Sequence, residues 1–306
     1  MHAEKPSTGE RLDVVPRAHQ TARMAETDAL PDAAPDPVAA KPKPKSETRD
    51  TLSFLVKLVI VVLIFRSFVF SPFSIPSQSM LPRLYIGDYL FVSKWNYGFS
   101  RWSLPFGVPL IPGRIFGRDP SRGDVVVFRG PAGDHDVIKR VIGLPGDTIQ
   151  MRAGQLVLNG KAIPKERVAD FTIPISPNYD TTTGECPAQF QDVDKAGKAI
   201  CRYMQFRETL PNGKAYMVLD RGEYPGADET DVYSVPKGAV FVMGDNRDDS
   251  GDSRFSPEQG GMGYVPMERI EGKAVVSFFS TDGSASWLLP WTWFSAARWK
   301  RIGDGF

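Results

Sequence analysis

Hydrophobic residues in this chain form one long run, followed by many short ones. The long run, TLSFLVKLVIVVLIFRSFVF, covers residues 51–70. Twenty helical residues span about 30 Å, the thickness of the hydrocarbon core of a bilayer. Lys57 and Arg66 lie within about two turns of its ends, where long side chains can extend to the lipid headgroups. The pattern predicts one transmembrane helix over 51–70, with a buried helix of a soluble protein as the alternative.

The chain after residue 70 has the pattern of a β protein. Short apolar runs such as DVVVFRG and GAVFVMGDN alternate with turn residues, and no long amphipathic helical period occurs between residues 71 and 276. A Gly-Asp pair, typical of a tight turn, adjoins β-rich runs at 87–88, 123–124, 146–147 and 244–245. We expect a mainly β fold, an antiparallel β-barrel or sheet. Residues 165–235 are polar, contain both cysteines and are predicted to form an inserted smaller β subdomain, with a long hairpin as the alternative.

The predicted organisation has four parts. Residues 1–50 contain no Phe, Trp or Tyr and cannot bury enough apolar surface to fold, so we expect a disordered tail. The transmembrane helix follows at 51–70, and one β domain comprises 71–164 and 236–306, with 165–235 inserted into it. Positive residues precede the helix closely, namely Lys41, Lys43, Lys45 and Arg49, whereas only Arg83 follows at a similar distance. By the positive-inside rule, the tail is cytoplasmic and the β domain is exported.

Composition excludes some functions and leaves other questions open. The formal net charge of +1 gives no bulk attraction to nucleic acid, and no Cys/His spacing of a zinc site occurs. Cys186 and Cys201 suit one disulfide in an oxidising compartment, but two free thiols fit about equally well. The segment WLLPWTWFSAARW, residues 287–299, contains four tryptophans and either lies at a membrane interface or caps the barrel.

A serine hydrolase with a histidine base is poorly supported. His2 and His19 belong to the predicted tail, and His135 stands alone in the polar stretch GPAGDHDVIK, where a solvated loop histidine is the simpler interpretation. The G-x-S-x-G motif of a nucleophile elbow and the H-E-x-x-H motif of a zinc protease are both absent from the sequence.

Lysine is the alternative base for a serine. Burial can lower its pKa by several units from about 10.4, and a neutral lysine can take the proton of a serine hydroxyl. Lys139 lies between apolar pairs in DVIKRVIGLPGD, and in a strand it points to the face opposite Arg140. A pair of charges on an edge strand is the alternative. The segment SIPSQSMLP, residues 74–82, directly follows the apolar run, and its hydroxyls provide either a nucleophile or a polar linker.

Four segments resemble, in order, the four signature boxes of the bacterial type I signal peptidases. They are PSQSMLPRLYIGDYLFVSKW (76–95), RGDVVVFR (122–129), IKRVIGLPGD (138–147) and GDNRDDSGDSR (244–254). The apolar run stands directly upstream of the first box, and the resemblance covers roughly residues 51–300. It implies that Ser79 is the nucleophile and Lys139 the general base. It further implies that the Ser77 hydroxyl and the Ser79 backbone N–H form the oxyanion hole.

The resemblance also implies supporting residues around this pair. Ser250 corresponds to the serine that orients the lysine, and Asp252 and Arg254 correspond to a salt bridge near the site. Residues 244–247 are expected to be scaffold. The matching positions for a shallow apolar substrate pocket are Phe73, Ile75, Met80, Leu84 and Ile138, although core packing is expected for some of them. Two residues depart from the family pattern, Arg83 and Val137, and neither is the nucleophile or the base.

The function implied by the resemblance is that of signal peptidase I. This serine endopeptidase removes signal peptides from exported preproteins on the outer, periplasmic face of the bacterial cytoplasmic membrane. The chain would be a single-pass protein with a cytoplasmic N-terminus, in contact with membrane lipid, and its partners would not include nucleic acid. The resemblance implies neither a metal nor an organic cofactor. Two alternatives remain: a related Ser-Lys processing peptidase of narrow specificity, and an inactive membrane-anchored binding or scaffold domain.

Overall fold

The computed structural model describes residues 47–306, apart from positions 134, 183 and 287. Its first element, helix α1 (Glu47–Phe68), is formed by the long apolar run, and nearly all of its side chains are exposed. Helix α1 is long enough and apolar enough to cross a membrane. It begins at Glu47 rather than at 51 and ends at Phe68, because strand β1 starts at Phe70. Of the predicted tail, only residues 47–50 belong to the described part, and they start α1.

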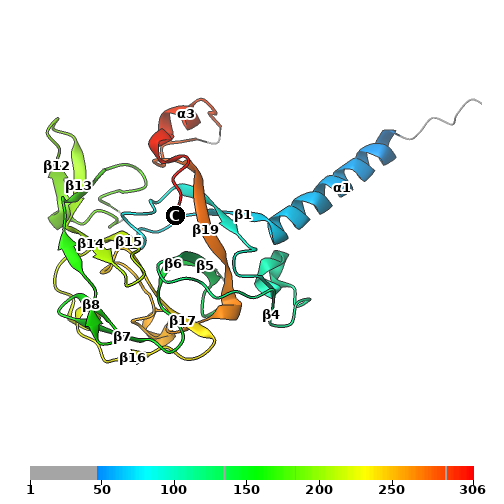
Figure 1. Ribbon diagram of the computed structural model, residues 1–306. Helices are drawn as coiled ribbons and strands as arrows, with labels where there is room; N and C mark the ends of the chain where they lie inside the picture. The colour runs from blue at the N-terminus through cyan, green and yellow to red at the C-terminus, as the bar shows by residue number, and fades with distance from the viewer. Residues whose placement is uncertain (1–46, 134, 183, 287) are drawn as a thin grey trace, which may run out of the picture. The chain divides into compact units, whose positions relative to one another are not determined.

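A seven-stranded antiparallel sheet carries the candidate site. Its order is β1-β2-β19-β5-β6-β17-β18, so within the described residues it is an open sheet with edges at β1 and β18. In Figure 1 the long strand β19, in orange, runs between β1 and the β5–β6 pair. The strands are β1 (Phe70–Ser74), β2 (Asp88–Ser93), β5 (Val125–Arg129), β6 (Asp136–Gly143), β17 (Ala239–Met243), β18 (Val265–Pro266) and β19 (Ile270–Ser280). The mainly β fold class is confirmed.

Four smaller antiparallel sheets accompany the large one in the described part of the chain. Their orders are β10-β14-β15, β11-β13-β12, β16-β7-β8-β9 and β3-β4. The first two lie within the predicted insertion, whereas β16, at its end, pairs with β7 outside it. The domain boundaries stay a prediction.

The remaining elements have the following bounds. The strands are β3 (Phe99–Ser100), β4 (Arg114–Ile115), β7 (Thr148–Arg152), β8 (Gln155–Leu158), β9 (Lys161–Ala162), β10 (Lys165–Arg167), β11 (Phe171–Pro174), β12 (Gln191–Val193), β13 (Ala199–Tyr203), β14 (Gln205–Thr209), β15 (Ala215–Leu219) and β16 (Tyr233–Ser234). The short helices are α2 (Pro225–Asp228) and α3 (Thr292–Ala296).

Three of the four Gly-Asp pairs close the same four-residue turn. In each turn the glycine has a φ of 87° or 88°, and the aspartate N–H donates to the carbonyl three residues earlier. The aspartate side chain accepts from the backbone N–H of that same residue, so the turn is closed twice. The three turns are Tyr85–Asp88, Ser121–Asp124 and Leu144–Asp147. Glycine adopts this φ without strain, which explains why the pair recurs before strands.

The strands next to the candidate site are buried on both faces. Strand β5 reads VVVFR, and β6 is buried at every position after its first residue. The register pairs Val126 with Lys139 and Val125 with Arg140. Separate apolar clusters cover the two faces of this pair of strands. A sheet covered on both sides needs nearly continuous apolar strands, and the two cations of β6 therefore enter an apolar interior.

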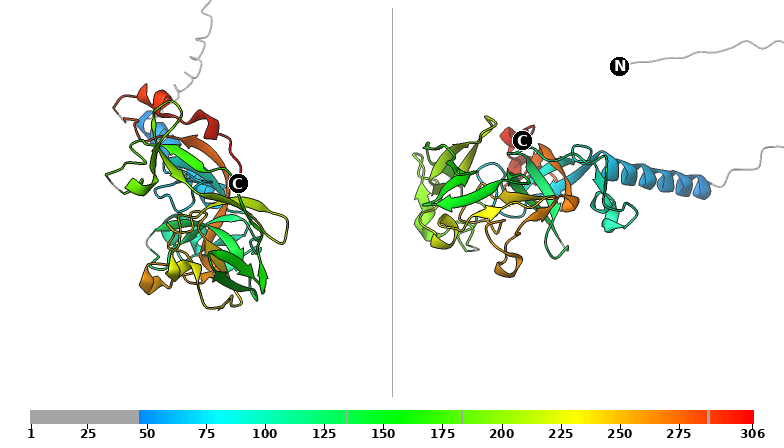
Figure 2. Two further views of the ribbon diagram at one scale, coloured as in Figure 1. Left: turned by 90° about the vertical axis from the view of Figure 1, so that its left-hand side faces the viewer. Right: turned by 60° about the horizontal axis from the view of Figure 1, so that its bottom comes forward.

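The C-terminal segment runs beside β19. Bridges join Thr281 to Ala297 and Val276 to Gly305, and both views in Figure 2 show the red segment next to the orange strand. The aromatic side chains of Trp291 and Trp299 are mostly exposed. The backbone of the segment thus packs on the sheet while these rings stay outside the core, and contact of the rings with lipid stays a prediction.

The two cysteines form a disulfide in the structure. Cys186 and Cys201 are buried, with 5.9 Å between their Cα atoms, and the bond joins the segment before β12 to β13. Both lie in a small core that contains Tyr179 and Tyr203. Of the two states that the sequence left open, the structure therefore has the disulfide.

Candidate active site

Ser79 lies in the loop between β1 and β2, which is held by a segment distant in sequence. The backbone N–H of Asn246 donates to the Ser79 carbonyl at 3.1 Å. Its side-chain Nδ2 donates to the Gln78 carbonyl at 3.2 Å. These two bonds fix the peptide units on both sides of the Ser79 Cα, and Ser79 is buried in this position. The residues 244–247, expected to be scaffold, thus act on the loop directly through Asn246.

Lys139 extends from the middle of β6 to the side chain of Ser79. Its Nζ lies 2.7 Å from Ser79 Oγ and 3.1 Å from the Ile138 carbonyl oxygen. The neighbouring Arg140 forms a two-pronged ion pair with Asp245 instead, with distances of 2.7 and 2.6 Å. Lys139 and Arg140 therefore point in opposite directions, as expected for neighbouring residues of a strand. The serine and the lysine, 60 residues apart in sequence, are brought into contact.

The surroundings of Lys139 favour its neutral form. Burial lowers the pKa of Lys139 to about 8, although the negative charges of Asp252, Asp245 and Asp249 act in the opposite direction. Asp252 and Asp245 are each bound to an arginine, and no ion pair of Lys139 itself is found among the described residues. Desolvation disfavours an ammonium ion that has no carboxylate partner. A substantial fraction of Lys139 is therefore neutral near pH 8.

Ser77 lies beside Ser79 on the exposed side of the same loop. The two Oγ atoms are 3.4 Å apart, and Ser77 is exposed whereas Ser79 is buried. Ser74, the third serine of SIPSQSMLP, is also exposed and ends β1. The Ser77 hydroxyl is thus able to donate to a group that approaches Ser79 from the open side.

Ser250, Asp252 and Arg254 form a buried group next to the loop. The Asp252 carboxylate accepts from Arg254 Nε at 2.9 Å and from the Gly244 N–H at 3.0 Å. Burial alone would raise the pKa of Asp252, but Arg254 and the backbone N–H groups hold it below its ordinary value. The buried Ser250 Oγ has no hydrogen-bond partner within the described residues. The expected salt bridge is present, and the Ser250 hydroxyl is unsatisfied.

Gly244 explains why this group lies so close to Ser79. A Cβ built on Gly244 would lie 2.5 Å from the Ser79 carbonyl oxygen and would also clash with Ser250. Unlike the other three Gly-Asp glycines, Gly244 does not have a positive φ. The expectation of a fourth turn of the same kind is therefore wrong: this glycine permits close packing, and Asp245 binds Arg140. The sequence signal was visible as GDN, but the contact it serves is tertiary.

The five expected pocket residues separate into two sets. Phe73, Ile75 and Ile138 line a cavity of about 310 Å³ beside β1 and β6. Met80 and Leu84 are fully buried in the same apolar cluster and do not line that cavity. Core packing was expected for some of the five residues, and Met80 and Leu84 are the two that pack in the core without lining the cavity.

Histidine and metal chemistry receive no support from the described residues. His135 is exposed in the turn before β6, with its ring near Gly130, and Lys139 is the titratable group bonded to Ser79 Oγ. No group of three His, Cys, Asp or Glu side chains that could hold a metal ion is found in the part that the structure describes.

Comparison with known proteins shows the family of the chain. The family model for signal peptidase, peptidase S26, matches residues 48–279, and the chain belongs to this family. Relatives named signal peptidase I narrow the assignment. The protein from Rickettsia massiliae is 37% identical over 238 residues, covering 74% of this chain and 77% of the relative. The protein from Rickettsia typhi is 37% identical over 234 residues, covering 73% and 77%.

Family membership defines the enzyme class. The chain is a membrane-anchored serine endopeptidase of the signal peptidase I family, whose substrates are the signal peptides of preproteins. The crystal structure of a signal peptidase I from Enterococcus faecalis V583 is 28% identical and covers 51% of this chain and 97% of that chain. Its TM-score of 0.26 is too low for a comparison of the two folds.

Proposed function

We propose that this chain cleaves signal peptides with a Ser79–Lys139 dyad. The observation that carries the proposal is the 2.7 Å separation of Lys139 Nζ and Ser79 Oγ at a buried site. There burial lowers the pKa of the lysine to about 8. A neutral amine at this distance can accept the hydroxyl proton, which makes the serine a nucleophile.

The reaction has two halves. Ser79 Oγ attacks the scissile carbonyl carbon while its proton moves to Lys139 Nζ. The C–N bond then breaks as Lys139 gives that proton to the leaving amine of the mature protein. The signal peptide remains as an ester on Ser79. Lys139 next takes a proton from a water molecule, whose oxygen attacks the ester, and returns the proton to Ser79 Oγ as the signal peptide leaves with a carboxylate.

Neighbouring residues support the dyad in this proposal. The Ser77 hydroxyl and the Ser79 backbone N–H donate to the oxyanion, a kind of contact worth about 3–4 kcal/mol each. The unsatisfied Ser250 hydroxyl beside Gly244 suits a hydrogen bond that orients the lysine. The Asp252–Arg254 pair is buried and holds the segment that carries Ser250.

Substrate specificity is assigned to the cavity beside β1. Phe73, Ile75 and Ile138 bound a space of about 310 Å³, which suits small residues at the −1 and −3 positions of the signal peptide. The peptide would lie extended along the edge strand β1, whose free edge can accept a further strand. Met80 and Leu84 support this wall from the core.

The proposed location is the bacterial cytoplasmic membrane, with α1 as its single span. Positive charges before the helix favour a cytoplasmic N-terminus and a β domain on the outer, periplasmic face. The Cys186–Cys201 disulfide fits an oxidising compartment. Anchoring places Ser79 where a signal peptide leaves the bilayer, which raises the effective concentration of the scissile bond.

Substitution of the nucleophile tests the proposal. We expect Ser79→Ala to reduce the rate of preprotein cleavage by at least about 10³-fold, because no hydroxyl remains to form the ester. Ser234→Ala, an exposed serine in β16 that does not line the cavity beside β1, serves as the matched control, and His135→Ala tests the histidine alternative. Full cleavage by the Ser79 variant, or loss of activity in the His135 variant, would refute the dyad. A panel of unrelated preproteins separates general signal peptidase activity from a processing peptidase of narrow specificity.

A further inference from the structure

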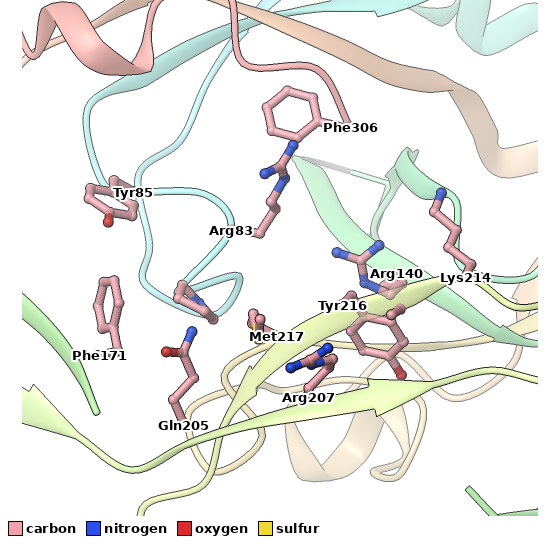
Figure 3. A pocket seen from close by; sticks show the side chains of 12 residues that line it. Arg83, Tyr85, Arg140, Phe171, Gln205, Arg207, Lys214, Tyr216, Met217 and Phe306 are labelled. Carbon is pink, nitrogen blue, oxygen red and sulfur yellow. The ribbon is translucent and has the colours of Figure 1, made fainter. Parts of the chain in front are cut away.

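A second cavity lies where the segment after Ser79 meets the β14–β15 hairpin. Its volume is about 680 Å³, roughly twice that of the cavity beside β1. Figure 3 shows its basic side chains entering from different segments: Arg83 from the loop, Arg140 from β6, and Arg207 and Lys214 from the hairpin. None of the side chains that line it is acidic, and Phe306, the last residue of the given sequence, is among the lining residues.

The cations around this cavity have too few anionic partners. Arg140 is neutralised by Asp245 at 2.6 Å. Lys214 reaches Asp124 only at 3.6 Å, and Asp124 already binds Lys273 at 2.7 Å.

The two remaining arginines, Arg83 and Arg207, add to this excess of positive charge. The Arg83 guanidinium donates to the neutral carbonyl of Gly305 and lies over the Phe306 ring. Arg207 has an exposed partner, Glu166, at 3.9 Å. An exposed pair at that distance leaves most of the arginine's charge uncompensated.

Burial makes this excess of positive charge costly for two of the cations. The pKa of Arg83 is lowered by burial, and the neighbouring charges of Arg140 and Arg301 lower it further. Asp304 and Asp245 act in the opposite direction. The pKa of Lys214 is lowered by burial and by Arg140 and Lys273, although Asp124 acts in the opposite direction. An anion bound in the cavity would offset the repulsion that Arg140 exerts on both groups.

We propose that this cavity binds the phosphate group of a phosphate ester. A planar guanidinium can bind a phosphate through two parallel N–H donors, and an ammonium adds a compact charge. Tyr85 and Phe171 form an edge-to-face pair along the wall, with ring centroids 5.7 Å apart. This apolar wall suits the organic part of the ester, and the two sources of such an ester are a lipid headgroup and a soluble phosphate ester.

The position of the cavity gives the bound group a structural consequence. Arg83 lies four residues after Ser79, and Arg140 directly follows Lys139, although its side chain enters the opposite face of β6. A phosphate held by Arg83 and Lys214 would connect the loop of the dyad to the β14–β15 hairpin. Binding to the folded chain alone raises its thermal stability as the ligand concentration rises.

Binding to the full chain in a non-ionic detergent tests the proposal. Inorganic phosphate and glycerol phosphate are titrated at constant ionic strength, with calorimetry and the melting temperature as readouts. We expect saturable binding with a rising melting temperature, and a loss of about tenfold in affinity for each of Arg83→Gln and Lys214→Gln. Lys195→Gln removes an exposed lysine elsewhere on the insertion and should bind like the unmodified chain.

A lipid arm distinguishes the two sources. Short-chain phosphatidylglycerol is titrated below its micelle concentration. Binding of this lipid without binding of free phosphate identifies a lipid headgroup site, and equal binding of all three ligands identifies a site for soluble phosphate. Absence of saturable binding for all three would overturn the proposal, as would equal affinity of the Arg83, Lys214 and Lys195 variants. Because no cleavage is measured, either result leaves the Ser79–Lys139 dyad untouched.

Discussion

Strand β6 holds two adjacent cations, Lys139 and Arg140, whose side chains enter opposite faces of the sheet. Their burial is nearly equal, since 5% of Lys139 and 3% of Arg140 is exposed. Their partners differ completely: Lys139 lies against the hydroxyl of Ser79, and Arg140 lies between the carboxylate of Asp245 and the ring of Tyr216. Burial alone lowers the pKa of both groups. For Arg140 the pair with Asp245 more than compensates and raises its pKa, whereas the pKa of Lys139 falls to about 8.

In the proposed mechanism, burial yields a general base only where carboxylates are kept away from the amine. Three aspartates act on Lys139 electrostatically, yet each is bound to an arginine: Asp252 to Arg254, Asp245 to Arg140 and Asp249 to Arg221. A direct carboxylate partner would favour the ammonium form and remove the base. The arginines near the site therefore contribute by occupying the carboxylates.

Of the predicted changes, replacing Lys139 by arginine should have the largest effect on the rate of cleavage. Arg cannot be deprotonated in a protein, so Lys139→Arg keeps the positive charge and removes the base. We expect cleavage of a preprotein to fall by at least about 10³-fold, measured as single-turnover rates. Lys195→Arg, on the exposed surface, is the matched control. If the Lys139→Arg variant kept an activity within about tenfold of that of the unmodified chain, a neutral amine would not be required.

Arg140 forms a buried ion pair with Asp245, so removing the charge of Asp245 should leave Arg140 as an unpaired buried cation. For Asp245→Asn we expect a loss of about 3–5 kcal/mol in the free energy of unfolding, measured by urea denaturation. The exposed pair Arg202–Asp192 provides the control, since Asp192→Asn should cost far less than Asp245→Asn. The double variant Arg140→Met with Asp245→Leu should recover most of the loss. Equal, small losses in the two single variants would contradict the role given to the buried pair.

The strand that contains Lys139 could be predicted because its signals are local, whereas the pairing of Lys139 with Ser79 was implied only by the family resemblance. A lysine between apolar pairs in a strand alternates with its neighbour in direction, and the Gly-Asp pairs before strands specify a turn by the φ of one glycine. The mainly β class follows from the same short-range pattern. These features depend on a few consecutive residues, and the structure has them at the expected places, except that Gly244 lacks the positive φ of the other three glycines.

The rest depends on contacts between distant segments, which a single sequence does not encode in any readable pattern. The Asn246 bonds to the loop of Ser79 and the tight packing at Gly244 are of this kind. Met80 and Leu84 share the apolar character and the core cluster of Ile75, yet they do not line the cavity, and only the folded chain decides which residue faces it. The basic cavity was not foreseen, because its cations come from three separate segments.

Gly244 packs against the loop of Ser79, on the side of Lys139, whereas Asp245 pairs with Arg140. A methyl group added at Gly244 should therefore lower the rate of cleavage more than it lowers the free energy of unfolding. A Cβ at Gly244 would lie 2.5 Å from the Ser79 carbonyl oxygen, and the loop must move. A displacement of about 1 Å can cost about 10²-fold in rate, which is the loss expected for Gly244→Ala. Gly226→Ala in α2 meets nothing within 4 Å and should retain full activity. Normal cleavage by the Gly244 variant would mean that the loop position is not critical.

The pH dependence of cleavage gives the finest test of the Lys139 environment. The base acts in its neutral form, so kcat/KM should rise about tenfold per pH unit at low pH and level off above about pH 8. The unfolded chain keeps the ordinary lysine pKa of 10.5, so unfolding between about pH 8 and 10.5 takes up a proton. The contribution of Lys139 to the free energy of unfolding therefore rises with pH through this window.

Asp249 makes the same profile sensitive to one distant charge. Its carboxylate raises the pKa of Lys139, so Asp249→Asn should move the midpoint of the kcat/KM profile downward, by less than about half a pH unit because the group is partly exposed and paired with Arg221. Asp231→Asn removes an exposed charge that does not act on Lys139 and should leave the midpoint unchanged. An upward shift, or equal shifts in the two variants, would mean that the midpoint does not report Lys139. A downward shift confined to Asp249→Asn would tie the midpoint to the β6 lysine, because Arg140 does not titrate in this range.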